Sequence, residues 1–193
     1  AVATALAEER QSHCLLVLRD GRIVHEWYAD GVTPDDDFEV FSVTKSVTAA
    51  IVGAAVTSGD LAVDDAASTM IEEWRGTDSA DVTVEDILQN LSGRFYDPVP
   101  DLVELGTKPD MTAHAIGLHQ TDEPGAVWHY NQSAIQTLEA VLEVATGRDP
   151  GDFAEGHLFA PIGMEVTFRR DAAGNIPMFA GLQAGCRDLG RFA

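Results

Sequence analysis

Residues 41–59 read FSVTKSVTAAIVGAAVTSG, and this stretch decides how the rest of the sequence is interpreted. Apolar side chains recur at helical spacing from Val43 to Ala55, and a glycine such as Gly59 is typical of a helix C-terminus. We therefore predict a helix over 42–59. Because small residues occupy nearly every face of this helix, we expect it to be buried on most sides, between a sheet and other helices.

Ser42 and Lys45 lie one turn apart at the start of this helix, and two interpretations fit them. Serine is a good N-cap, but a capping box has Glu or Gln where this chain has Lys45. A lysine in the first turn opposes the helix dipole, at a cost of about 0.3–1 kcal/mol if exposed. Dipole and burial both favour the neutral amine, which is a competent general base beside a hydroxyl. Since the chain has only two lysines, we favour a nucleophile with its base. The backbone N–H of Ser42 can then help to stabilise an oxyanion.

Tyr130 is the second candidate and lies in VWHYNQ, residues 127–132, shortly after a Glu-Pro-Gly turn. A tyrosine in a loop usually packs against its neighbours. Next to a cationic lysine, however, its phenol loses a proton more easily and can relay it. Tyr130 is therefore the partner that a Ser-Lys pair needs.

Other catalytic and metal-binding patterns are missing from the sequence. It has no G-x-S-x-G, H-E-x-x-H, P-loop or G-x-G-x-x-G motif. His114 and His119 are five residues apart, which places them on different sides of a helix and argues against a zinc site. No local feature indicates a Ser-His-Asp triad, although six histidines leave that alternative open. We predict no metal and no organic cofactor.

Composition excludes some partners. The 12 basic and 32 acidic residues give a formal charge of −20, which repels nucleic acid and anionic membranes. No apolar run reaches the roughly 18 residues that a membrane span requires. The N-terminal residues 1–11 carry acids where a signal peptide has an apolar core, so we expect a soluble protein and favour the cytoplasm over export. Cys14 and Cys186 lie far apart without a CxxC pattern, and we expect two buried free thiols.

The remaining elements are predicted from turns, caps and periodicity. We expect a helix over 2–11 and a hairpin over 14–28 that turns at Asp20-Gly21, followed by a polar connection over 31–40. Later helices are predicted over 82–93 (capping box Thr83 and Asp86, end at Gly93), 131–147 (capping box Ser133 and Gln136, end at Gly147) and 152–160 (before Pro161), with a loose hairpin around Gly174-Asn175 in 166–179.

Six segments resemble motifs of the serine β-lactamase and penicillin-binding-protein superfamily, and they occur in that superfamily's order. The similarity is to the class C-like branch, which includes family VIII esterases, D-amino acid peptidases and 6-aminohexanoate-dimer hydrolases. The segments are LVLRDGRIVHEWY (16–28), FSVTKSVTAAIVGAAVTSGDLAVDD (41–65, with the S-x-x-K motif), ILQNLSG (87–93), EPGAVWHYNQ (123–132), APIGM (160–164) and AGLQAGCRDLGRF (180–192).

The resemblance implies roles for the candidate residues. Ser42 would be the acylated nucleophile, Lys45 its helper in proton transfer, and Tyr130 the group that passes the proton to the leaving atom. Where the family's Y-x-N motif has its asparagine, this chain has Gln132, and Asn131 lies beside it. Either amide can therefore be the one that reaches the substrate.

The resemblance also implies a fold: α+β, with an antiparallel sheet, flanking helices and an all-α lobe, as in β-lactamases and transpeptidases. Residues 1–60 would form the hairpin and nucleophile helix of the α/β region, and 61–193 a mostly helical lobe. The family's later strands, one with a K-T-G or H-T-G triplet, do not appear in this sequence. We thus expect one incomplete catalytic domain that lacks the C-terminal strands. Those strands could be disordered, cleaved off, not included in this sequence, or supplied by another chain, and the oligomeric state stays open.

The leading hypothesis is a serine hydrolase that cleaves a small ester, amide or peptide-like substrate through an acyl-enzyme. One alternative is an inactive binding or regulatory homologue of the same fold. Another is a β-lactamase or D,D-peptidase that acts on cell-wall-like substrates. We favour esters or small linear amides because the N-terminal segments look closest to the esterase and oligomer-hydrolase branch.

Overall fold

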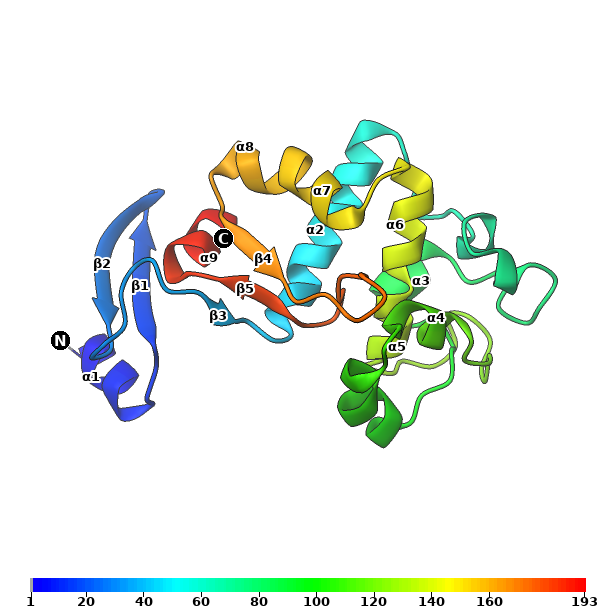
Figure 1. The fold of residues 1–193 in the computed structure, drawn as a ribbon, viewed down its shortest axis with the longest axis horizontal. Coiled ribbons are helices and arrows are strands. Elements are labelled where there is room, and N and C mark those ends of the chain that lie inside the picture. The colour runs from blue at the N-terminus through cyan, green and yellow to red at the C-terminus, as the bar shows by residue number, and fades with distance from the viewer. Residues whose placement is uncertain (1) are drawn as a thin grey trace.

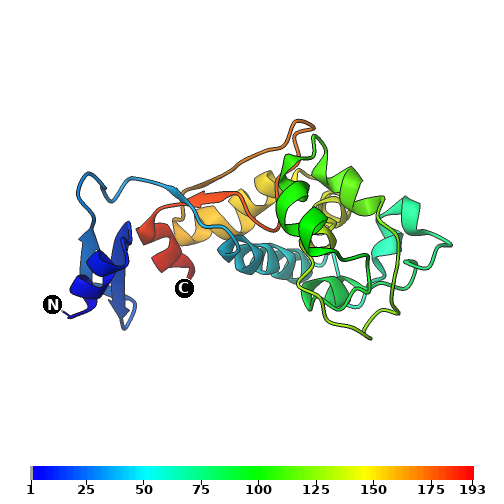
Figure 2. The same ribbon diagram turned by 90° about the horizontal axis from the view of Figure 1, so that it is seen from below.

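The computed structural model describes residues 2–193, which form an elongated molecule with a hairpin at one end (Figures 1 and 2). No helix in this range is long and apolar enough to cross a membrane. The elements are α1 (Val2–Glu9), β1 (Cys14–Arg19), β2 (Arg22–Tyr28), β3 (Phe38–Glu39), α2 (Val43–Ser58), η1 (Ala67–Thr69), η2 (Glu72–Trp74), α3 (Val84–Leu88), η3 (Pro100–Glu104), η4 (Leu105–Thr107), α4 (Met111–Ile116), α5 (Gln132–Gln136), α6 (Leu138–Thr146), α7 (Pro150–Ala154), η5 (Glu155–Phe159), α8 (Ala160–Ile162), β4 (Val166–Phe168), β5 (Leu182–Ala184) and α9 (Cys186–Phe192).

The predicted hairpin is confirmed. Strands β1 and β2 pair antiparallel, and the turn residues Asp20 and Gly21 have φ angles of 52° and 69°. Positive φ at both central residues is what a two-residue turn between right-twisted strands requires.

A second sheet has the order β3-β5-β4, with both pairings antiparallel. The prediction of only a polar connection over 31–40 is therefore wrong at Phe38–Glu39. The predicted hairpin within 166–179 is also wrong, because β4 pairs with Leu182–Ala184 across a longer loop. A side chain of α5 bonds the backbone of the loop between these strands. Gln136 Nε2 donates to the Ile176 carbonyl, and Gln136 Oε1 accepts the Met178 N–H.

Helix α2 crosses the middle of the molecule and contacts α6, α7 and η5 (Figure 1). Its buried face includes Val47, Ile51 and Ala55. The expectation of burial on most sides is wrong, since Val56 is 37% exposed on the opposite face and Ser46 and Gly53 on that face are exposed as well. Small side chains permit close packing on every face but do not require it.

Cap chemistry explains where the other helices begin and end. The Thr83–Asp86 capping box is confirmed, but α3 ends at Leu88, before Gly93. The predicted Ser133–Gln136 box is wrong: the side chain of Asn131 accepts the Ala134 N–H at 2.8 Å, so the N-cap lies two residues earlier, at Asn131. The continuation of this helix, α6, ends at Gly147 as predicted.

The helix predicted to end before Pro161 instead continues through it. Helices α7, η5 and α8 follow one another without a break from Pro150 to Ile162. Pro161 lies in the first turn of α8, where a helix tolerates a residue that has no N–H.

Cys14 and Cys186 form a disulfide that joins β1 to α9, with their Cα atoms 6.5 Å apart. The prediction of two free thiols is therefore wrong. Sequence separation gave no indication of this pairing, because it depends on where α9 packs after the whole chain has folded.

Candidate active site

Helix α2 presents Ser42 and Lys45 on one side of its first turn. Ser42 occupies the N-cap position, but its side chain accepts no capping hydrogen bond. The hydroxyl is exposed and instead lies 3.1 Å from the Lys45 Nζ. The preceding Phe41 has a φ of 46°, a left-handed conformation that is strained for a bulky residue and concentrates at functional sites. The arrangement favours the nucleophile interpretation over the cap.

The half-buried Lys45 ammonium has two further acceptors. Its Nζ donates to the Phe179 carbonyl at 2.9 Å and to Gln132 Oε1 at 3.3 Å. Together with Ser42 these match the three N–H bonds of an ammonium group. Lys45 therefore has one defined orientation, which brings α2, α5 and the segment before β5 to a single point.

Tyr130 completes the cluster, because the Lys45 Nζ lies 4.6 Å from the centre of its ring. Burial raises the pKa of the Tyr130 phenol, but hydrogen bonds with Ser42 and Lys45 and the positive charge of Lys45 outweigh this effect. The pKa of Tyr130 consequently lies below its ordinary value. A phenol of this kind accepts and returns a proton more readily near neutral pH.

The two neighbouring amides have different surroundings. Asn131 is buried, caps α5 and donates from Nδ2 to the carbonyls of Arg94 and Phe95. Gln132 turns its Oε1 to Lys45. The structure thus places Gln132 in the cluster and Asn131 in its scaffold, and the amide that reaches a substrate stays a prediction.

Two contributors to the cluster were missed by sequence reasoning. One is the Phe179 carbonyl, since a backbone acceptor carries no sequence signal. The other is Asp101, a buried carboxylate in η3 that accepts the backbone N–H groups of Gln132 and Ser133. Asp101 lies in an irregular stretch near several other acids, so its sequence surroundings did not distinguish it.

His114 and His119 do not form a metal site with the residues of this cluster. His114 lies on α4, and His119 packs against the Phe95 ring at 4.8 Å between centroids. Within residues 2–193 no group of three His, Cys, Asp or Glu side chains is arranged to hold a metal ion.

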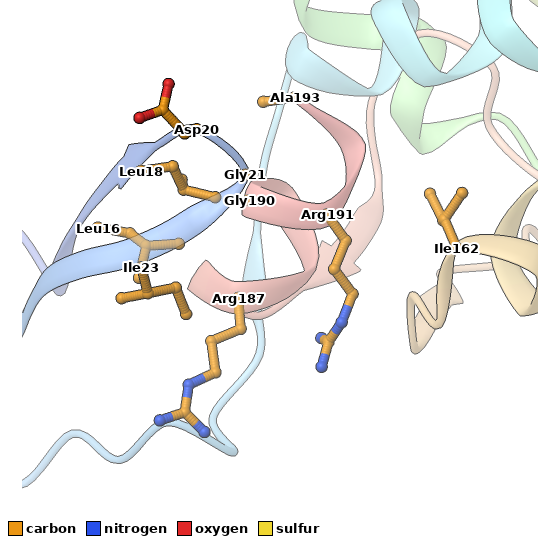
Figure 3. A pocket seen from close by; sticks show the side chains of 10 residues that line it. All are labelled: Leu16, Leu18, Asp20, Gly21, Ile23, Ile162, Arg187, Gly190, Arg191 and Ala193. Carbon is orange, nitrogen blue, oxygen red and sulfur yellow. The ribbon is translucent and has the colours of Figure 1, made fainter.

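Two pockets lie in different parts of the molecule. One of about 640 Å³ lies between the hairpin and α9, where Leu16, Leu18 and Ile23 face Gly190 (Figure 3). It is lined by none of the cluster residues. A second, of about 440 Å³, is lined partly by Phe179, whose ring centre is 5.9 Å from the Lys45 Nζ. Phe179 thus contributes to the second pocket, and its backbone carbonyl accepts a hydrogen bond from Lys45.

Solved structures share this fold at low sequence identity. A protein from Bacillus anthracis assigned as a 6-aminohexanoate-dimer hydrolase matches with a TM-score of 0.84 and 21% identity, over 98% of this chain and 55% of its own. A protein from Bacteroides dorei assigned as a β-lactamase matches with a TM-score of 0.82 and 24% identity, over 99% and 60%. A D-alanine carboxypeptidase from Burkholderia cenocepacia matches with a TM-score of 0.73 and 20% identity, over 98% and 60%.

These matches establish the α+β fold with its antiparallel strands, flanking helices and helical lobe, and this chain spans little more than half the length of each of the three structures. The sequence itself matches the Beta-lactamase family over residues 2–192. The S-x-x-K helix, the tyrosine loop and the shared fold agree with that match, and the chain belongs to the Beta-lactamase family.

Proposed function

We propose that this chain carries the acylation machinery of a serine hydrolase, with Ser42 as nucleophile and Lys45 and Tyr130 in proton transfer. The observation that carries the proposal is the contact of 3.1 Å between Ser42 Oγ and Lys45 Nζ, with the Tyr130 ring centre 4.6 Å from the same Nζ. A nucleophile and a proton acceptor within hydrogen-bond reach are the geometric requirement for covalent catalysis.

In the proposed reaction, Ser42 Oγ attacks the substrate carbonyl carbon while its proton passes to the Tyr130 oxygen. Tyr130 then gives that proton to the leaving oxygen or nitrogen, and the bond to the leaving group breaks to form an acyl-enzyme. Water hydrolyses the ester of Ser42 and restores the hydroxyl. Tyr130 accepts the Ser42 proton as the phenolate, which the positive charge of Lys45 favours by lowering the pKa of Tyr130.

The Ser42 backbone N–H is available for the oxyanion. It donates to no acceptor among the hydrogen bonds of residues 2–193. An N–H at the start of a helix is favourably placed to stabilise negative charge on a substrate oxygen.

For the substrate we propose a small ester or linear amide. The exposed Ser42 is accessible to such a substrate. The names of two structural neighbours, a D-alanine carboxypeptidase and a D-stereospecific amidohydrolase, are the reason for including amides.

Labelling with a fluorophosphonate probe and mapping of the modified peptide tests this function. We expect a single adduct on Ser42, and Ser42→Ala should lose at least about 99% of the labelling because only an activated serine reacts at a useful rate. Ser46→Ala is the matched control, since Ser46 is exposed one turn further along the same helix and should leave labelling unchanged. A folded wild-type protein that stays unlabelled, or equal labelling of Ser42→Ala, would sink the proposal.

A further inference from the structure

We propose that Asp101 is a positioning residue that holds Gln132 and Tyr130 against the Ser42–Lys45 pair, an inference that rests on the proposed function. Asp101 lies in η3, on a segment separate from every other member of the cluster. Asp101 is only 3% exposed.

Both carboxylate oxygens of Asp101 are occupied by backbone donors. Oδ2 accepts the Gln132 N–H at 2.8 Å and Oδ1 accepts the Ser133 N–H at 2.7 Å. None of the ion pairs formed within residues 2–193 includes Asp101. A buried carboxylate is costly without such partners, so these two charge-assisted bonds fix the start of α5 firmly to η3.

The backbone of Asp101 controls the Gln132 side chain as well. The Asp101 carbonyl accepts the Gln132 Nε2–H at 3.0 Å. Because the amide nitrogen is held there, the amide oxygen must point the other way, where it accepts from Lys45 at 3.3 Å. One residue thus sets both the main chain and the amide orientation of Gln132.

Tyr130 is two residues before Gln132, so the same anchor fixes the end of its loop. Asp101 also acts on Tyr130 through its charge, since the nearby carboxylate raises the pKa of the phenol and opposes Lys45. This effect of Asp101 is smaller than those of Ser42 and Lys45, which lower the pKa of Tyr130. Displacement of Tyr130 from that pair should therefore raise the pKa of the phenol, whereas loss of a helix cap elsewhere should not.

A purely structural role is the alternative that the experiment must exclude. Asp110 offers a matched control because its carboxylate caps α4 at the Ala113 N–H, at 2.8 Å, without touching the cluster. Asp101→Asn and Asp110→Asn each replace one capping carboxylate by an amide of the same shape.

Two measurements test the proposal. The first is the rate of fluorophosphonate labelling of Ser42. The second is the ultraviolet titration of Tyr130, taken as the difference between each protein and the same protein with Tyr130→Phe, which removes the signals of the other two tyrosines. For Asp101→Asn we expect labelling to slow by about 10- to 100-fold, as for a misplaced reacting group, and the Tyr130 titration to move to higher pH as Tyr130 leaves Ser42 and Lys45.

Asp110→Asn should change the labelling rate by no more than about twofold and should cause no resolvable shift of the Tyr130 titration. Labelling of Asp101→Asn at the wild-type rate, or a Tyr130 titration that does not move to higher pH, overturns the proposal. If the wild type is never labelled, the proposed function fails and the titration alone decides the role of Asp101. If Asp101→Asn does not fold, Asp101→Ser, which keeps one hydroxyl acceptor, should show the same two changes.

Discussion

Glu139 shows how a single buried acid makes stability depend on pH. It lies on α6, is 4% exposed, and burial raises its pKa to about 7, with a hydrogen bond from Thr112 opposing the shift and nearby acids adding to it. Because the folded pKa lies above the ordinary 4.5, protonated Glu139 favours the folded state. This contribution is complete below about pH 4.5 and is lost as the pH rises through about 7.

We therefore predict that Glu139→Gln raises the free energy of unfolding at pH 8 by about 1–3 kcal/mol, with little change at pH 4.5. Urea denaturation of both proteins at the two pH values measures the difference. The exposed Glu155, replaced by Gln, should give no such pH-dependent gain. Equal effects of Glu139→Gln at both pH values would contradict the assigned pKa.

At the same scale, the sequence indicated some site residues better than others. Ser42 and Lys45 could be predicted because residues three apart in a helix lie on the same side of one turn, so their sequence spacing already brings the two side chains together. The sequence could not tell which of Gln132 and Asn131 faces Lys45. The directions of two adjacent side chains at a loop-to-helix junction depend on which residue caps the helix, and that residue is Asn131. Asp101 depends on a contact between η3 and α5 that no local pattern encodes.

Among the elements, the turn at Gly93 supports the loop that carries Tyr130. The Gly93 carbonyl accepts the N–H groups of Thr121 and Asp122, and the neighbouring Asn90 carbonyl accepts the His129 N–H at 3.0 Å. Gly93 has a φ of 66°, and a Cβ at this position would overlap the Asp122 carbonyl oxygen. Only glycine fits both the backbone conformation and this close approach.

Gly93→Ala should consequently destabilise the protein by about 2–4 kcal/mol, since it combines a left-handed alanine with a backbone clash. Gly125→Ala is the matched comparison, because Gly125 has a φ of 80° but nothing within 4 Å of the added carbon. Its cost should be only about 1–2 kcal/mol. Thermal unfolding of the two variants checks the difference, and a Gly93 variant no less stable than the Gly125 variant would show that the clash relaxes freely.

Elements with local signals were predictable, and those that depend on distant partners were not. The Asp20-Gly21 turn and the Thr83–Asp86 box carry their own chemistry. By contrast, Ile176 and Met178 are fully buried, and Gln136 from α5 bonds the Ile176 carbonyl and the Met178 N–H. These backbone groups are therefore not paired with a strand. Strand β4 pairs with Leu182–Ala184 instead.

For the whole molecule, the hairpin is attached to the remainder mainly through α9. The disulfide joins Cys14 to Cys186, the Arg187 guanidinium pairs with Glu26 at 2.8 Å, and Gly190 lets Leu16 pack directly on the helix. Figure 2 shows the hairpin beyond α9, with the extended segment before β3 as its main-chain connection to the rest of the molecule. Composition and spacing could not reveal this attachment, because its parts come from opposite ends of the chain.

The cross-link should therefore control how firmly the hairpin is held. It connects residues 172 positions apart, and closing so long a loop restricts the unfolded chain, which stabilises a protein by about 2–5 kcal/mol. We predict that a reducing agent lowers the melting temperature of the wild type and speeds amide exchange in residues 14–28 before it affects α2. The double variant Cys14→Ser, Cys186→Ser should behave like the reduced protein and should not respond to the reducing agent. A wild-type melting temperature that reduction leaves unchanged would mean that Arg187, Glu26 and the contact of Leu16 with Gly190 are sufficient to dock the hairpin.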